Sequence, residues 1–196
     1  ILDYHHLPIC AIMLLFFGAF FITTFGTRGG VRKIVSMIAS AASLACLIAL
    51  IKPVMIDGDI SYWLGSRGIA GGYAIGIAIE VDALSLFFGL LVGIAAFAAC
   101  VYSLDYVTHD AHQVQYYTLL LMTSGGVLGM VLTGDIFNMY IMVEILTIGA
   151  VGLTAYRSKS EGALEAAFKY LVVGSIGSAF ILTAIVMLYA EAHTLN

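Results

Sequence analysis

The sequence predicts an all-α membrane protein, a polytopic bundle of about six transmembrane helices that forms a single domain over residues 1–196. Of the 196 residues, 62% are hydrophobic and only 10% are charged, and the mean hydropathy is +1.05, which is far too apolar for a soluble domain. The few charges separate apolar stretches of about 20 residues, the length that crosses a bilayer as a helix. Helices are expected because these stretches lack the alternation of a barrel strand.

The first two spans are expected at about 7–26 and 34–51, where they would form a hairpin. The basic residues between them are Arg28, Arg32 and Lys33. Lys52 closes the second span. No basic residue precedes the first span, so it is interpreted as a structural helix and not as a cleavable signal peptide.

A glycine-rich interval follows at 53–82, and its composition is unfavourable for a helix interior. We expect an irregular loop outside the cytoplasm. Residues 73–81 have the pattern of a short strand, and the glycines at 71 and 72 would turn a hairpin before it. The alternative, a re-entrant or spanning segment, is disfavoured by the glycines and by Arg67.

Four further spans are expected at about 83–104, 116–133, 136–156 and 162–189. Asp82 and Asp135 stand directly before the third and fifth of the six, where an aspartate caps a helix by accepting amide hydrogen bonds and by complementing the helix dipole. The capping role alone would explain both residues.

The distribution of Lys and Arg predicts the orientation. The loops after the first, third and fifth spans carry five basic residues and the other loops carry two: Arg28, Arg32, Lys33, Arg157 and Lys159 against Lys52 and Arg67. Because cytoplasmic loops are enriched in these residues, both termini are expected on the extracytoplasmic side. We expect a multi-pass protein of a prokaryotic cell membrane.

Glu144 is the clearest candidate for function. It lies nine residues after Asp135, which is about 13 Å along a helix and therefore near the middle of the membrane. An ionisable group at that depth costs about 2.5–3.5 kcal/mol or more, so it needs a partner, a hydrated cavity or a function. The alternative is a structural hydrogen bond to another helix.

Lys169 is the second candidate, about 10 Å into the last span. The short loop before that span makes the last two helices antiparallel neighbours, so we expect the depths of Glu144 and Lys169 to differ by only several ångströms. Desolvation favours the neutral forms of such a pair and mutual attraction favours the charged forms, which makes it a bistable proton site. The alternative is an intrahelical pair of Lys169 with Glu165, four residues earlier.

The third loop supplies a secondary candidate, His109, beside two acids and another histidine: Asp105, Asp110 and His112. Histidine titrates near physiological pH and could feed protons toward the membrane. A solvated loop is the simpler interpretation, and two histidines without a nearby cysteine do not form a metal motif.

Other classes of function are excluded by composition. The three dispersed cysteines do not form a ligand set for zinc, haem or an iron–sulfur cluster, so we expect no metal, no cofactor and no catalytic centre in this chain. A net charge of −4 without a basic patch argues against nucleic acid.

Three segments resemble a known family, the antiporter-like subunits of Mrp antiporters (D-type), complex I and membrane-bound hydrogenases. Residues 134–144, Gly-Asp-Ile-Phe-Asn-Met-Tyr-Ile-Met-Val-Glu, resemble the fifth-helix motif. Residues 165–178 resemble the sixth helix, and 81–85 the entry to the third. The resemblance implies that Glu144 is the fifth-helix glutamate and Lys169 the sixth-helix lysine, with protonation changes passing laterally to the next subunit. Asp135 and Glu165 are secondary candidates.

Members of that family continue through further helices, including a broken seventh helix with a central lysine. We therefore expect a truncated or split subunit whose missing helices come from a partner chain. The expected function is proton or Na⁺/H⁺ translocation in a multi-subunit complex in lipid, driven by peripheral redox subunits or acting as a stand-alone antiporter. The alternative is a non-conducting structural subunit.

Overall fold

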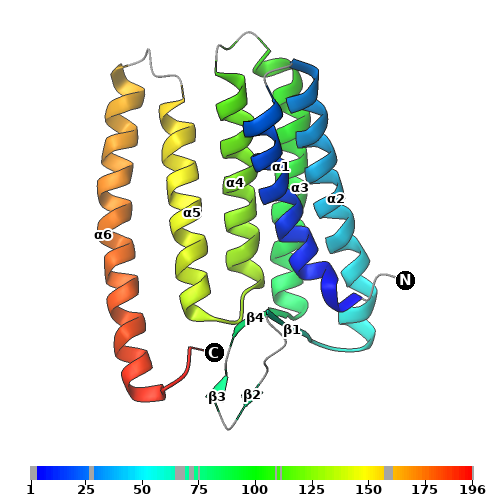
Figure 1. Ribbon diagram of the computed structural model, residues 1–196, viewed down its shortest axis with the longest axis vertical. Coiled ribbons are helices and arrows are strands. Elements are labelled where there is room, and N and C mark those ends of the chain that lie inside the picture. The colour runs from blue at the N-terminus through cyan, green and yellow to red at the C-terminus, as the bar shows by residue number, and fades with distance from the viewer. Residues whose placement is uncertain are drawn as a thin grey trace.

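The computed structural model describes residues 4–26, 29–64, 69–70, 73–74, 76–108, 110, 112–156 and 161–195. Within these ranges, six long helices run up and down in antiparallel succession (Figure 1), and all six are long and apolar enough to cross a membrane. After a 3₁₀ turn at Tyr4–His6 they are α1 (Leu7–Phe25), α2 (Gly29–Ile56), α3 (Ala83–Tyr106), α4 (Gln113–Leu132), α5 (Ile136–Ala155) and α6 (Glu161–Ala192). The predicted all-α bundle is confirmed.

Two helices are longer than the hydropathy pattern indicates. α2 continues past Lys52 and Pro53 to Ile56, and its end is closed by a hydrogen bond of 2.7 Å from the backbone N–H of Asp57 to the carbonyl of Pro53. α6 has 32 residues. A charged residue ends an apolar stretch of sequence but leaves the backbone hydrogen bonds of the helix intact, so hydropathy alone does not fix where a helix ends.

The core lies among α1, α2, α3 and α4, which pack closely (Figure 1). Glycine allows the closest approach: a Cβ atom added to Gly18 of α1 would lie 2.7 Å from the Cβ of Ala39 of α2. The fully buried side chains at the centre are large, and they come from α1, α2 and α4: Leu15, Ile22, Leu47, Leu50, Tyr117, Leu121 and Leu128.

α5 packs on α4, and α6 packs on α5 at the edge of the bundle (Figure 1). The backbone of α5 comes close to α4 at Gly126, where an added Cβ would lie 3.0 Å from the backbone nitrogen of Leu146. On α6, three buried residues mark the face toward α5: Ala167, Ser178 and Ile185. Most other described side chains of α6 are exposed.

A small β structure closes the end of the bundle where both termini lie (Figure 1). β1 (Ile60–Leu64) pairs antiparallel with β4 (Ile77–Val81), and β2 (Ile69–Ala70) pairs with β3 (Tyr73–Ala74). The stretch predicted as one strand is thus divided between β3 and β4. β4 is also attached to the connection between α4 and α5, because the N–H of Gly134 donates to the carbonyl of Ala78 at 3.0 Å.

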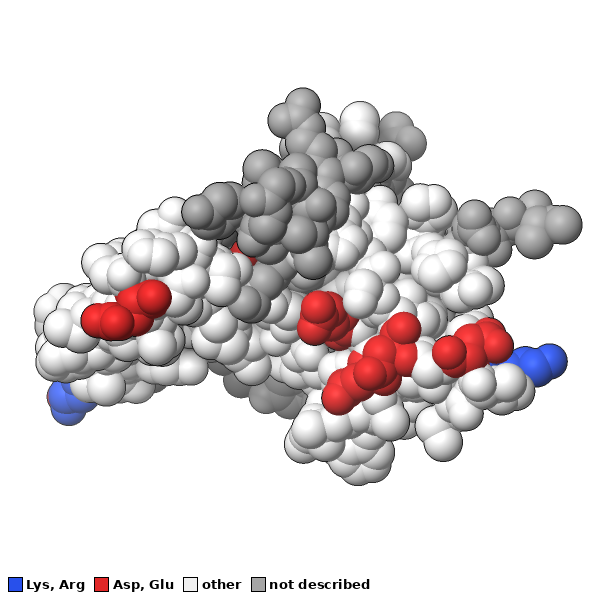
Figure 2. All heavy atoms as spheres, turned by 90° about the horizontal axis from the view of Figure 1, so that it is seen from below, with Lys and Arg blue, Asp and Glu red and all other residues white. Residues whose placement is uncertain are grey.

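The two ends of the bundle differ in charge. Figure 2 looks onto the end with the β structure: acidic side chains gather over the middle of this face, and Lys or Arg side chains of the described residues appear at its edges. At the opposite end, Arg32 and Lys33 stand in the first turns of α2.

Candidate ion-translocation site

Glu144 lies in the middle of α5 and is half-buried. It follows the first residue of the helix by eight positions, which is about 12 Å along the axis. Glu144 therefore lies near the middle of the length of α5. The phenol of Tyr140, one turn earlier, interacts electrostatically with the carboxyl of Glu144. Tyr140 was not among the predicted residues, although its spacing of four residues could have indicated it.

The neighbours of α5 fix the direction in which Glu144 points. Met142 and Leu146 touch α4 at Gly126, and each residue turns the helix by about 100°. Glu144 is therefore rotated by about 160° from both and points away from α4. The same side of α5 carries Phe137 and Ile148, which are 41% and 58% exposed. Glu144 thus faces a side of α5 that the described residues leave partly open.

Lys169 is paired with Glu165 on the outer side of α6. The ammonium nitrogen lies 2.5 Å from Glu165 Oε1, and the side chains of the lysine and the glutamate are 71% and 66% exposed. Each lies two positions from Ala167, which is buried against α5, so both point about 160° away from the α5 interface. Of the two partners considered for Lys169, Glu144 and Glu165, the structure therefore shows Glu165.

The register of α5 and α6 separates Glu144 from Lys169. A Cβ added to Gly174 would lie 2.8 Å from Cγ2 of Thr147, so these two residues are at the same level. Glu144 precedes Thr147 by three residues and Lys169 precedes Gly174 by five. Because the helices are antiparallel, the two charged residues lie about 12 Å apart along the axis. The structure brings Lys169 to Glu165, and it does not bring Lys169 into direct contact with Glu144.

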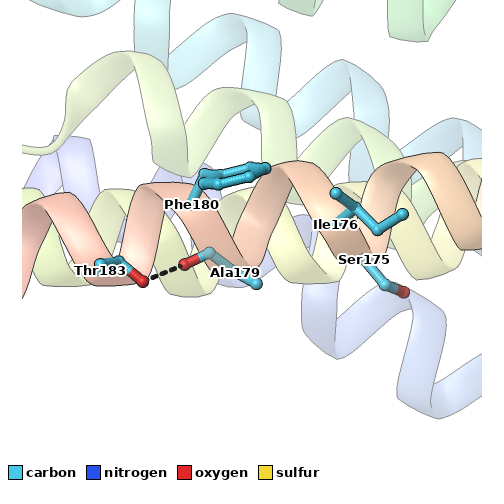
Figure 3. A pocket seen from close by; sticks show the side chains of 5 residues that line it. All are labelled: Ser175, Ile176, Ala179, Phe180 and Thr183. Atoms are coloured by element: carbon cyan, nitrogen blue, oxygen red, sulfur yellow. Dashed lines mark hydrogen bonds between the residues drawn. The ribbon is translucent and has the colours of Figure 1, made fainter.

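A shallow groove lies on the same outer side of α6. It has a volume of about 320 Å³, and Figure 3 shows that its five lining residues all come from α6: Ser175, Ile176, Ala179, Phe180 and Thr183. The hydroxyl of Thr183 donates to the carbonyl of Ala179 at 2.8 Å. The groove and the Glu165–Lys169 pair therefore share one face.

Asp135 is buried at the start of α5 and caps the helix. Its Oδ1 accepts the backbone N–H of Asn138 at 2.7 Å, and the side-chain amide of Asn138 donates to Thr133 Oγ1 at 2.8 Å. The segment after α6 returns to the same place, where the N–H of Ile136 donates to the carbonyl of Leu195 at 2.9 Å. These contacts supply the capping role that was expected of Asp135.

Asp82 caps α3 in the same way, with a reciprocal capping box. Its Oδ1 accepts the N–H of Ser85 at 2.7 Å, and the N–H of Asp82 donates to Ser85 Oγ at 2.9 Å. The backbone hydrogen bond from Ser85, followed by that from its hydroxyl, holds the pKa of the Asp82 carboxyl below its usual value. Beside it lies a polar cavity of about 480 Å³ whose lining residues are Asp59, Ser61, Glu80, Asp82 and Thr133.

The third loop is described only in part, and His109 lies outside the described residues. Asp110 accepts a hydrogen bond from the hydroxyl of Tyr156, which ties the loop to the end of α5. In the part of the chain that the structure describes, no group of three His, Cys, Asp or Glu side chains is arranged to hold a metal ion.

Six antiparallel apolar helices, with a carboxyl at mid-depth in the fifth and a lysine in the sixth, define a polytopic helical membrane protein with ionisable groups inside its spans. Two family models match this chain. The model described as NADH:quinone oxidoreductase/Mrp antiporter, TM, matches residues 133–196, which include Glu144 and Lys169. The model described as NADH-Ubiquinone oxidoreductase (complex I), chain 5 N-terminus, matches residues 69–117. The chain belongs to this superfamily of antiporter-like membrane subunits.

Individual relatives agree with the family models. NADH-quinone oxidoreductase subunit N of Desulforudis audaxviator is 34% identical over 123 residues, 62% of this chain and 24% of the relative. A chain of the membrane-bound sulfane sulfur reductase, an archaeal respiratory membrane complex, is 29% identical with a TM-score of 0.86, over 96% of this chain and 38% of that one. A chain of the Mrp complex from Dietzia shares the fold, with 19% identity and a TM-score of 0.84 over 100% of this chain and 36% of that one.

This chain therefore spans about a quarter to two fifths of the length of the relatives that it matches. The two structural matches cover 96% and 100% of this chain, and so extend over its six described helices and the β structure.

Proposed function

We propose that this chain forms part of the ion path in the membrane arm of a multi-subunit complex, with Glu144 as a proton-binding group. The observation that supports the proposal is the position of its carboxyl: at mid-depth in α5, half-buried and turned away from α4. A charge at that depth is costly unless it is compensated. A carboxyl at that depth therefore needs a cation or water on its open side, and such a neighbour is what a proton path would supply.

Lys169 acts as a second station of the same path, not as a contact partner of Glu144. Its ammonium rests on Glu165, about 12 Å along the axis from Glu144. Charge passes between the two stations through water or through side chains that cover the outer side of α5 and α6. In this scheme Glu165 positions the amino group of Lys169 on the outer side of α6.

The side chains on that outer side come from other helices, supplied by the rest of the subunit or by a partner chain. The exposed face of α6, with its charged pair and its groove, supports this, and so does the greater length of the relatives. The solved relatives belong to multi-subunit membrane complexes. Chains that co-purify with this one decide between the two driving forces: iron–sulfur subunits indicate a redox-driven pump, and Mrp-like membrane chains alone indicate an antiporter.

We place the loops that follow α1, α3 and α5 in the cytoplasm, as the distribution of basic residues predicts. Single cysteines at the two ends of α2, tested with a membrane-impermeant maleimide in whole cells, check this. Labelling is expected at position 57 and not at position 30.

The test of the path is Glu144→Gln in the assembled complex, reconstituted in vesicles that report proton movement by a pH-sensitive dye. The substitution keeps shape and removes titration, so we expect normal assembly and loss of transport. Glu191→Gln, an exposed acid at the end of α6, is the matched control and is expected to keep full activity. Normal transport by an assembled Glu144→Gln complex would overturn the proposal.

The second candidate function is a non-conducting structural subunit. The observation that favours it is that Asp135 and the Glu165–Lys169 pair already have local structural partners. In that case Glu144→Gln would impair assembly and leave transport per assembled complex unchanged.

A further inference from the structure

Tyr140 lies one helical turn before Glu144 on α5, and its side chain is half-buried. Four residues turn a helix by about 400° and advance it by about 6 Å, so the two side chains point within about 40° of each other and lie one above the other. Met142, which touches α4, is rotated by about 160° from both of them. Tyr140 and Glu144 therefore share the side of α5 that points away from α4.

The phenol of Tyr140 interacts with the carboxyl of Glu144 in two ways: the charge of the carboxylate acts on it, and the carboxylate accepts a hydrogen bond from its hydroxyl group. A hydrogen bond to an ionised acceptor is about twice as strong as one between neutral groups. The contact therefore strengthens when Glu144 loses its proton, and that ionised form is the one that is costly at this depth.

The ring of Tyr140 is held in place by Phe137, one turn closer to the start of α5. The two ring centroids are 6.2 Å apart, and the ring planes are inclined by 31°. Phe137 itself stands in the first turn of the helix, beside the cap that Asp135 forms on Asn138. Phe137, Tyr140 and Glu144 therefore form a continuous row that begins at the capped end of the helix.

This row extends from Glu144 in the direction opposite to Lys169. Tyr140 precedes Thr147 by seven residues, almost two full turns, so these two side chains point in nearly the same direction. Thr147 touches α6 at Gly174, which places Tyr140 on the side of α5 that faces α6. With the register that this contact sets, Tyr140 lies about 18 Å along the axis from Lys169, and Glu144 lies between them.

We propose that Tyr140 is a positioning residue of the ion path, a role that rests on the proposed function of Glu144. Its hydroxyl donates to the carboxylate of Glu144 each time that carboxylate has released its proton. This chain thereby supplies part of the compensation that an ionised carboxyl needs at that depth. The hydrogen bond also holds the carboxylate toward the end of the bundle that carries the β structure, while Lys169 lies toward the other end.

The test is Tyr140→Phe in the assembled complex, because this substitution keeps the ring and its contact with Phe137 and removes only the hydroxyl. Proton transport in reconstituted vesicles is expected to fall about ten-fold, the effect of losing one hydrogen bond to a charged group. Assembly and melting temperature are expected to stay near those of wild type. The matched control is Tyr102→Phe, which removes the hydroxyl of a tyrosine of α3 that is 66% exposed and should keep full transport.

Infrared difference spectroscopy of the same variants separates a positioning role from a structural one. The C=O band of protonated Glu144 is assigned by its loss in Glu144→Gln. In Tyr140→Phe this band is expected at a higher wavenumber than in wild type, because the acid has lost a hydrogen-bond partner. In Tyr102→Phe the band is expected at its wild-type position.

Full transport by an assembled Tyr140→Phe complex, or an unshifted C=O band, overturns the role of Tyr140 and leaves the proposed function of Glu144 standing. Normal transport by Glu144→Gln overturns the proposed function itself, so the two failures are distinguishable. Should Tyr140→Phe fail to assemble, wild type labelled with ring-deuterated tyrosine replaces it. A tyrosine band is then expected to change together with the Glu144 band and to be missing in Glu144→Gln; its persistence in that variant contradicts the contact.

Discussion

The first four helices and the last two are built from similarly apolar sequence, but they are covered to different degrees. Between 28% and 39% of the spans of α1 to α4 is buried, against 11% for both α5 and α6, although the hydropathy of α6 is close to that of α1. Lipid tails satisfy an apolar side chain as well as another helix does. Hydropathy therefore places a helix in the membrane, and only shape and polar groups decide which helices pack together.

We call α1 to α4 the supporting region and α5 with α6 the working region, because the residues of the proposed ion path lie on the last two helices. α1 to α4 hold their positions through small residues, filled volume and polar contacts. Some of these contacts stay within a helix, as from Ser40 to Ser36, and others join two helices, as from Ser43 of α2 to the carbonyl of Ala11 of α1. α5 and α6 carry the carboxyl of Glu144 and the charged pair on sides that the described residues leave exposed or partly open. Substitutions in the first region should act on folding, and those in the second on transport.

The largest effect is expected from filling the closest contact of the supporting region. Gly18→Leu puts a side chain where a Cβ alone would lie 2.7 Å from the Cβ of Ala39, so α1 and α2 must separate and little folded protein should be recovered. Gly177→Leu is the same substitution on α6, where no atom lies within 4 Å of the added Cβ. Fluorescence-detected size exclusion should show a monodisperse peak for the second variant alone. Equal yields of folded protein from the two variants would contradict the claim that α1 to α4 are more tightly packed than α6.

A large effect on transport, with little on stability, is expected from Lys169→Met. The pair with Glu165 is exposed, and exposed pairs contribute at most about 1 kcal/mol. The melting temperature of the assembled complex should therefore stay near that of wild type while proton movement falls several-fold. Glu165→Gln removes the acidic partner of Lys169 but leaves the lysine in place. This variant should retain part of the transport activity, and the pH dependence of transport should shift. Unchanged transport in Lys169→Met would show that the lysine serves only the local pair.

The smallest effect concerns the cap of α3 and depends on pH. Asp82→Ala removes the capping box and should cost about 1 kcal/mol of stability at neutral pH. The folded pKa of Asp82 lies below its unfolded value, so its contribution is fully present above the unfolded pKa, about 3.9. It is lost as the pH falls through the folded value. Thermal unfolding from pH 7 to pH 3 should show the difference between wild type and variant shrinking below about pH 4; a constant difference would contradict a charged cap.

The sequence predicts well how far along a helix a residue lies, and it predicts poorly which neighbouring residues its side chain faces. The six spans and the mid-depth position of Glu144 follow from the spacing of charges along apolar stretches, and the caps at Asp82 and Asp135 follow from local hydrogen bonding. The register of α5 and α6 does not follow from the sequence, because it is set by the contact of Thr147 with Gly174. Hydropathy does not predict such a contact. A shift of that register turns an expected separation of several ångströms between Glu144 and Lys169 into about 12 Å.

Charge pairs within one helix are easier to predict from sequence than charge pairs between helices. The spacing of Glu165 and Lys169 was sufficient to raise their pairing as an alternative, since residues four apart share a helix face. The face that this pair occupies required the structure, because Ala167 gives no indication from sequence that it turns toward α5. The end of α2 beyond Lys52 was missed for a similar reason: a charge is a sign of the membrane surface, not of a helix end.

Infrared difference spectroscopy of the complex during turnover tests most directly whether the carboxyl of Glu144 changes its protonation state. Our account predicts a change in the C=O band of a protonated carboxylic acid in wild type and in Glu191→Gln, and no such change in Glu144→Gln. The same band in all three proteins would contradict the account, because another acid would then carry the proton.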